Sequence, residues 1–125
     1  MKLIDPGPSD RGWHQFQKAL QCPRKYALSY KVPKDQVVRE ASDALVKGSL
    51  IHVGLAHVYG LRRGDTDLYS PEEAIAELSR RELETTGNEL WEKHRELAQH
   101  VVRQYELFWA HEDWTPLLIE EQFKA

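Results

Sequence analysis

The segment from Ser42 to Leu61 constrains the fold of this chain more than any other segment. Its residues are apolar on almost every side when they are placed at 3.6 residues per turn, whereas a surface helix keeps its apolar residues on one face. We therefore predict a central helix over 42–61 that packs against several neighbours. The apolar residues that support this prediction are Ala44, Leu45, Val46, Leu50, Ile51, Val53, Leu55, Ala56, Val58, Tyr59 and Leu61.

Three glycines lie within this predicted helix at intervals of six residues. Gly48, Gly54 and Gly60 would each destabilise a helix by up to ~1 kcal/mol relative to alanine. Either they permit close contact with a neighbouring element, or one of them ends the helix. The sequence Arg62-Arg63-Gly64 that follows is typical of a helix end, with cations in the last turn and glycine just beyond it.

Further helices are predicted on both sides of the central one. One starts at Ser9 or Asp10, and Cys22-Pro23 restarts a second short helix, because proline is well tolerated in a first helical turn. Ser70-Pro71-Glu72-Glu73 has the pattern of a capping box, which predicts a helix over 70–85. The longest regular stripe of apolar residues then predicts a helix of about 22 residues that begins at Leu90.

Two segments do not follow a helical pattern. Residues 31–40 are rich in charge and contain Pro33, so we expect a mobile connector there. Residues 115–123 form a short apolar run after a proline, which favours a strand. A lone strand leaves backbone groups unpaired on both edges, so we expect self-association through this edge. The predicted fold is mainly α, with four or five helices and one terminal strand.

Size and composition indicate one globular unit. A chain of 125 residues with a mean hydropathy of −0.64 has the size of one ordinary domain and a largely wet surface. No apolar run approaches the ~18 residues of a membrane span, and no signal peptide pattern is present, so we expect no membrane contact. Cys22 is the single cysteine, which excludes an internal disulfide and favours the cytoplasm.

Charge is divided unevenly along the chain. Residues 1–63 carry 11 basic and 5 acidic side chains, whereas residues 64–125 carry 6 and 15, so the two halves differ in sign. Such asymmetry favours a polyanionic partner for the basic half, although two solvated helical surfaces could also differ in this way. The basic half includes a mixture suited to phosphate contacts and base stacking, namely Arg24, Lys25, Tyr26, Tyr30, Lys31 and Lys34. The alternative is a solvated connector whose aromatic residues turn inward.

Few residue patterns that mark enzymes are present. The sequence has no glycine-rich phosphate loop, no His-Glu-x-x-His, no Gly-x-Ser-x-Gly and no paired cysteines. Two candidates remain, His52 within the apolar helix and Glu120 within the predicted strand. His52 is either a metal ligand or a core histidine with one hydrogen bond. Glu120 is either a functional carboxylate or a residue that faces solvent by strand alternation.

Four motifs follow one another along the chain, namely Ser9-x-x-x-Trp13, Cys22-Pro23-Arg24-Lys25-Tyr26, Gly48-Ser49-Leu50-Ile51-His52, and Trp114 with Leu118-Ile119-Glu120-Glu121-Gln122-Phe123. Their order resembles the N-terminal part of RecB-like nucleases of the PD-(D/E)XK superfamily. This group includes phage exonucleases, the AddB nuclease domain and CRISPR-associated exonucleases. The resemblance covers about 9–123. It implies the front portion of an α/β, restriction-endonuclease-like fold, and it implies an enzyme that hydrolyses phosphodiester bonds at DNA ends.

The resemblance implies roles for particular residues. His52 would be a ligand of a divalent metal, Mg²⁺ or Mn²⁺, in a site otherwise rich in oxygen. Glu120 matches the acidic residue of the first core strand and would support the metal pocket. DNA is the implied partner, in the cytoplasm of a bacterial or phage-infected cell. Its contacts would come from the basic segment, at Arg24, Lys25, Tyr26, Lys31 and Lys34.

The sequence also departs from the pattern of these nucleases. It lacks the Asp of a Gly-x-x-Asp turn on a second core strand, and Glu-x-Lys occurs nowhere. Asp113 followed by Glu120-Glu121-Gln122 could imitate a variant of that arrangement, although seven residues barely allow two strands and a turn. The lone Cys22 does not support the iron-sulfur cluster of some relatives.

Three hypotheses about the function follow from these observations. The first is the N-terminal portion of a metal-dependent DNA nuclease, an exonuclease by resemblance, that is catalytically incomplete over residues 1–125. The second is a helical module that binds DNA or a protein without cutting, derived from a truncated nuclease. The third is a small regulatory protein whose acidic half imitates DNA.

Overall fold

The structure is a computed structural model, and it describes residues 1–4, 13–32 and 41–121. The chain divides into two compact units. The larger unit contains Met1–Pro6 and Ala41–Ala125, and the smaller unit contains Gly7–Glu40. Each unit is described below by itself.

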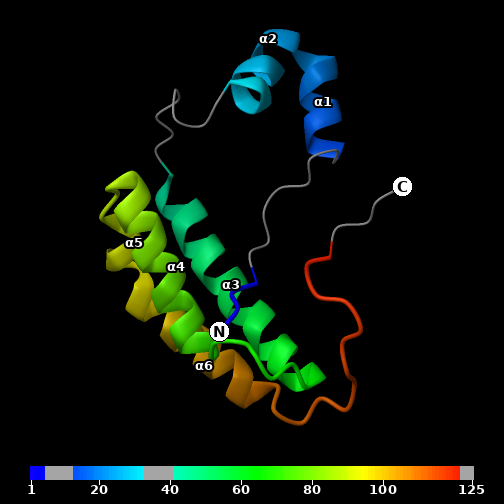
Figure 1. The fold of residues 1–125 in the computed structure, drawn as a ribbon, viewed down its shortest axis with the longest axis vertical. Coiled ribbons are helices and arrows are strands. Elements are labelled where there is room, and N and C mark those ends of the chain that lie inside the picture. Colours follow the sequence, from blue (N-terminus) through cyan, green and yellow to red (C-terminus); the bar gives the residue numbers. More distant parts are fainter. Residues whose placement is uncertain (5–12, 33–40, 122–125) are drawn as a thin grey trace. The chain divides into compact units, whose positions relative to one another are not determined.

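The larger unit is built around a central helix. Helix α3 (Asp43–Arg63) contacts α4 (Pro71–Thr86), the short helix α5 (Leu90–Lys93) and α6 (Arg95–Phe108), and α4 also contacts α6 (Figure 1). The prediction of a central helix packed on several sides is therefore confirmed. Helix α3 is also long and apolar enough to cross a membrane by length and composition alone, but much of its apolar surface packs against these helices, as in the core helix of a globular unit.

The core of this unit forms where the three long helices meet. Val46, Leu50 and Val53 of α3 are at most 1% exposed. They lie with apolar side chains of the other helices in one cluster, whose remaining buried members are Val58, Ala74, Ile75, Trp91, Ala98 and Val102.

One glycine of α3 explains how the helices come so close. A Cβ atom placed on Gly54 would lie 2.8 Å from both Ile75 Cδ1 of α4 and Val102 Cγ2 of α6, which is closer than real side-chain contacts allow. Gly60 is similarly restricted by Leu68, whereas Gly48 has nothing within 4 Å. Two of the three glycines therefore permit close contact, and none of them ends the helix.

The helix ends follow the capping signals of the sequence. Ser42 Oγ accepts a hydrogen bond from the Leu45 N–H at 3.3 Å, and α3 ends at Gly64 with φ of 99°. Ser70 and Glu73 form the predicted capping box of α4, which ends at Gly87 with φ of 68°. Left-handed backbone suits glycine because it lacks a Cβ atom.

The long helix predicted from Leu90 is interrupted at one residue. His94 separates α5 from α6, yet its N–H donates to the Leu90 carbonyl at 3.0 Å and its carbonyl accepts from the Ala98 N–H at 3.1 Å. The helical hydrogen bonds therefore continue across the interruption. His94 Nε2 lies 2.6 Å from Asp43 Oδ1 at the start of α3, and this bond holds the pKa of the Asp43 carboxyl below its usual range.

The prediction of a strand over 115–123 is wrong for residues 115–121, which are the part of this range that the structure describes. Residues 109–121 follow α6 as an irregular segment without a strand, and the one β-bridge among the described residues joins Lys2 to Leu68. A strand requires a partner for its backbone groups, and this segment is instead held by side chains of α3. Within 109–121 there is thus no strand edge through which the expected self-association could occur.

The smaller unit contains three short helical elements. Helix α1 (Trp13–Gln21) is followed by α2 (Pro23–Tyr26) and by a π-helix, η1 (Ala27–Lys31). Cys22 has an extended backbone, with φ of −158°, and Pro23 opens α2, so the predicted restart at Cys22-Pro23 is confirmed. Lys31 ends η1, and residues 33–40 of the expected connector lie outside the described residues.

Candidate functional site

The two residues singled out from the sequence lie in direct contact in the larger unit. His52 Nε2 of α3 is 2.5 Å from Glu120 Oε1, although 68 residues separate them in the chain. Their side chains are 52% and 34% exposed, so both are accessible to solvent. Glu120 adopts a φ of 50°, an uncommon value for a residue other than glycine. His52 therefore faces the 117–121 segment and is not sealed among aliphatic neighbours.

Two arginines at the end of α3 hold the irregular segment in place. Arg62 Nη2 donates to the Trp109 carbonyl at 3.1 Å, and Arg62 also forms an ion pair with Glu112. Arg63 Nη1 donates to the Leu117 carbonyl at 3.1 Å. These contacts fix the segment at three points before Glu120, and the last of them lies three residues from Glu120.

One face of α3 and the irregular segment enclose a cavity of about 330 Å³. His52, Leu55, Ala56 and Tyr59 come from α3, at positions that share one helical face. The other lining residues are Trp114, Pro116, Leu118, Ile119 and Glu120. The cavity is thus apolar over most of its wall, with the His52–Glu120 pair as its polar part.

An aromatic pair forms another part of the same wall. The rings of Tyr59 and Trp114 are stacked, with centroids 5.1 Å apart and planes 21° from parallel. The Tyr59 hydroxyl lies 2.5 Å from the Tyr105 hydroxyl and donates to Glu112 at 3.3 Å. Burial, followed by the bond to Tyr105, raises the pKa of Tyr59 above its usual value, so its hydroxyl stays protonated. The sequence analysis did not assign a role to either ring.

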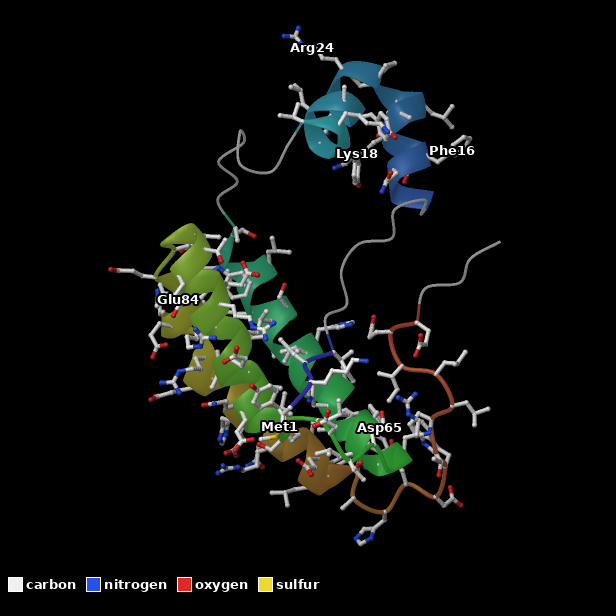
Figure 2. The ribbon with its side chains drawn as sticks, viewed as in Figure 1. Met1, Phe16, Lys18, Arg24, Asp65 and Glu84 are labelled. Atoms are coloured by element: carbon white, nitrogen blue, oxygen red, sulfur yellow. The ribbon has the colours of Figure 1, made fainter. Side chains whose placement is uncertain are left out.

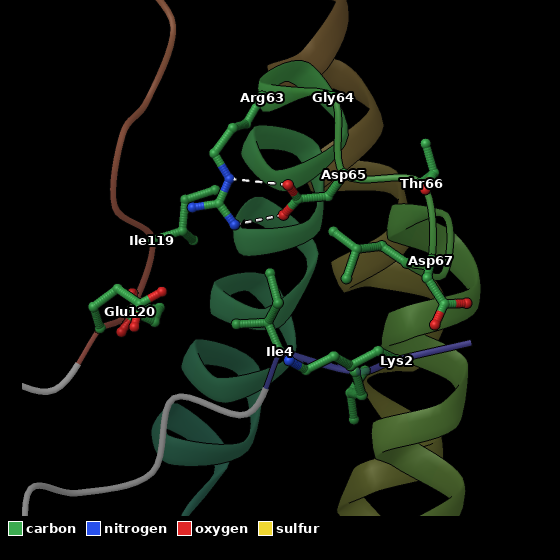
Figure 3. Close-up of a pocket in the computed structure, with 12 residues that line it drawn as sticks. Lys2, Ile4, Arg63, Gly64, Asp65, Thr66, Asp67, Ile119 and Glu120 are labelled. Atoms are coloured by element: carbon green, nitrogen blue, oxygen red, sulfur yellow. Dashed lines mark hydrogen bonds and ion pairs between the residues drawn. The ribbon is translucent and has the colours of Figure 1, made fainter.

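A second cavity, of about 620 Å³, lies on the other side of Glu120. Figure 3 shows that the guanidinium of Arg63 is paired through two nitrogens with the Asp65 carboxylate. This pairing lowers the pKa of the Asp65 carboxyl. Lys2 and Glu120 line the same cavity. Ile119 and Glu120 line both cavities, so Glu120 occupies the boundary between them.

The pair fits part of a divalent metal site. An imidazole nitrogen and a carboxylate oxygen are both suitable donors for Mn²⁺, and carboxylate oxygen suits Mg²⁺. A metal bound by both atoms would replace the proton that they share, because ligands bind metals in their deprotonated form. Over residues 1–4, 13–32 and 41–121, however, no group of three His, Cys, Asp or Glu side chains is positioned to hold a metal. Asp113 does not complete the pair, and Gln122 lies outside the described residues.

His52 is not the core histidine that was one of its two predicted alternatives. A different histidine of α3, His57, is buried in the core. His57 is fully buried, its Nε2 accepts from the Ile4 N–H at 3.0 Å, and its Nδ1 donates to the Tyr69 carbonyl at 2.9 Å. Burial lowers the pKa of His57, against a smaller opposite effect of the Tyr69 bond. His57 is therefore a neutral structural residue. Its partners are 12 and 53 residues away, and no sequence pattern reveals them.

The other predicted site residues lie in the smaller unit. Arg24, Lys25 and Lys31 are exposed there, and residues 13–32 contain four basic side chains and no acidic one. Lys31 Nζ lies 5.8 Å from the centre of the Tyr26 ring, and Lys18 Nζ lies 5.3 Å from that of Tyr30. Figure 2 shows Lys18 and Arg24 on this unit. Lys34 lies outside the described residues.

A family comparison assigns most of the chain to one superfamily. A model of the PD-(D/E)XK nuclease superfamily matches residues 14–124 of the chain. This match covers both His52 and Glu120. The chain belongs to the PD-(D/E)XK nuclease superfamily. A search of curated proteins found no match, and a search of solved structures also found none.

Proposed function

We propose that this protein is a metal-dependent DNA nuclease of the RecB-like group, acting on DNA ends, in which His52 and Glu120 supply two donors to the metal site. The contact of 2.5 Å between their side chains carries the proposal. The subgroup is supported by the sequence Cys22-Pro23-Arg24-Lys25-Tyr26 and by Gly48 with His52. Bound there, Mg²⁺ or Mn²⁺ would polarise a scissile phosphate and activate water.

The residues of this chain would play limited roles in that chemistry. The imidazole of His52 would bind through Nε2, and the Glu120 carboxylate would bind or orient a ligand beside it. Further acidic ligands are needed for such a site, and they are not found among the described residues. We therefore expect residues 1–125 alone to bind the metal weakly and not to hydrolyse DNA.

The test is a Mn²⁺ titration of the full chain by isothermal calorimetry. His52→Ala and Glu120→Gln should each weaken Mn²⁺ binding by about tenfold or more, because each removes one of two donors. His100→Ala is the matched control, since His100 is an exposed histidine of α6 outside the cavity. Equal affinities for the wild type and both site variants would contradict the proposal.

A second candidate function is nucleic-acid binding without cleavage. The observation that favours it is the smaller unit, whose described residues carry four cations and no carboxylate. We propose that Arg24, Lys25, Tyr26 and Lys31 contact the DNA backbone, with Lys34 following in the same basic segment. Mn²⁺ binding that is weakened by His52→Ala and by Glu120→Gln would decide for the nuclease against this alternative, because binding of DNA without cleavage needs no metal donors.

A further inference from the structure

We propose that the exposed face of Trp114 is a stacking platform for an unpaired nucleobase at the end of a DNA strand. This inference rests on the proposed function and names the part of the substrate that the cavity beside His52 receives. It makes Trp114 a substrate-positioning residue. The substrate class is then a DNA end with a single-stranded terminal nucleotide.

The first observation is that the aromatic pair and the donor pair share one cavity. Trp114 and Tyr59 line the same space of about 330 Å³ as His52 and Glu120. A nucleotide bound there could place its base on the ring while its phosphate lies toward the two donors. Proteins that bind single-stranded DNA combine phosphate contacts with base stacking in this way, and the restriction to a strand end comes from the proposed function.

The second observation is that the ring of Trp114 is supported by Tyr59 and remains partly exposed to solvent. One side contacts Tyr59 at a centroid distance of 5.1 Å, yet Trp114 remains 49% exposed. Tyr59 is itself fixed by the bonds of its hydroxyl and by the Arg62 guanidinium, whose carbon lies 5.1 Å from the ring centre. A platform held in this way does not have to be ordered when the ligand binds, so less entropy is lost.

The third observation is the chemistry of the cavity wall. It contains no lysine or arginine, and apart from His52, Glu120 and the Tyr59 hydroxyl its side chains are apolar. A phosphate in this cavity would have no positive charge beside it unless a metal were bound. The flat face of a base, in contrast, could stack on the ring of Trp114. The wall therefore selects a base rather than the sugar-phosphate backbone, and stacking tolerates any of the four bases.

The test measures binding of single-stranded oligonucleotides to the full chain in the presence of a chelator, so that no hydrolysis occurs. Two oligonucleotides carry the fluorescent base 2-aminopurine at the 5′ or the 3′ end, and two matched ones carry an abasic residue there. The variants are Trp114→Phe, which keeps an aromatic face, and Trp114→Leu, which keeps an apolar side chain without one. Trp109→Leu is the control, because Trp109 is 43% exposed and lies outside this cavity.

The inference expects quenching of 2-aminopurine at one end by the wild type, by Trp114→Phe and by Trp109→Leu, but not by Trp114→Leu. It also expects Trp114→Leu to bind about tenfold more weakly, and the abasic end to weaken wild-type binding by a similar factor. The abasic comparison uses the wild type alone, so it does not depend on how the variants fold.

Two other outcomes have separate meanings. Tight wild-type binding that is unaffected by the abasic residue and by Trp114→Leu would overturn the stacking platform and leave the proposed function standing. Failure of the wild type to bind any oligonucleotide in the chelator would overturn the stacking platform, and the separate Mn²⁺ titration would decide whether the proposed metal donors are also wrong.

Discussion

Single atoms decide how closely the helices of the larger unit approach one another. At Gly54 the missing Cβ atom leaves room for Ile75 of α4 and Val102 of α6. The six-residue spacing of the glycines indicated that some of them permit contact. It did not show which ones, because that depends on neighbours more than 20 residues away.

A pair of glycine substitutions tests this. Gly54→Ala should destabilise the protein by about 1–3 kcal/mol, because the new methyl group overpacks the core. Gly48→Ala should stabilise it by up to ~1 kcal/mol, since nothing lies within 4 Å and alanine favours a helix. Urea unfolding of both variants measures the difference, and equal effects at the two positions would contradict the packing described here.

His57 makes the stability of the fold sensitive to acid. Because burial lowers its pKa in the folded state, the unfolded chain takes up a proton at a higher pH, near its ordinary value of about 6.5. The folded state is therefore fully favoured above about pH 6.5 and loses stability as the pH falls below that value.

His57→Phe removes both the titration and the two hydrogen bonds. At neutral pH it should cost about 2 kcal/mol or more, because the Ile4 N–H and the Tyr69 carbonyl lose their partner. Between about pH 7.5 and 5.5 its stability should fall less than that of the wild type. Denaturant unfolding at the two pH values checks both effects, and His100→Phe serves as a control. Parallel pH profiles of wild type and His57→Phe would refute the assignment.

At the scale of elements, the helices were predictable and the final segment was not. Capping signals and apolar periodicity are local, so α3 and α4 start and end within a few residues of their predicted positions. The apolar run 115–123 matched a strand by composition, but a strand depends on a partner that composition does not reveal. The contacts of Arg62 and Arg63 with this segment span about 50 residues and have no sequence signature.

The arginine contacts predict how the segment responds to substitution. Arg63→Gln should loosen residues 117–121 and weaken Mn²⁺ binding severalfold, because Glu120 is then less well held beside His52. Hydrogen exchange of peptides from this segment measures the loosening. Arg81→Gln is a suitable control, since Arg81 pairs with Glu77 within α4. Unchanged exchange in Arg63→Gln would show that the segment is fixed by other contacts.

At the scale of the whole molecule, the chain combines a unit with metal-capable donors and a unit with a purely basic described surface. The sequence was expected to form one globular unit, so this division was not predicted. The motifs singled out His52 and Glu120, which lie on the α3 and C-terminal segments that the structure brings together. The aromatic wall of Tyr59 and Trp114 was not predicted, because the two residues lie 55 positions apart and only Trp114 belongs to a nuclease-like motif. The spacing of Tyr59 seven residues after His52 was the one available signal, since it places both on one helical face.

The basic unit predicts a salt dependence for DNA binding. Each phosphate contact to a single strand contributes about 0.7 to the slope of log affinity against log salt. Replacing both Arg24 and Lys25 by glutamine should therefore reduce this slope by about 1.4. Fluorescence anisotropy at several salt concentrations measures it, with Arg80→Gln/Arg81→Gln on α4 as the charge-matched control. A slope unchanged by the first double variant would remove these residues from the DNA contact.

The central claim is that His52 and Glu120 bind one divalent metal ion. Its most direct measurement is an anomalous difference map from crystals of the full chain soaked in Mn²⁺. The account predicts a peak within bonding distance of His52 Nε2 and a Glu120 oxygen, and loss of that peak in His52→Ala. A map without a peak at this position, with the two side chains still in direct contact at a saturating Mn²⁺ concentration, would contradict it.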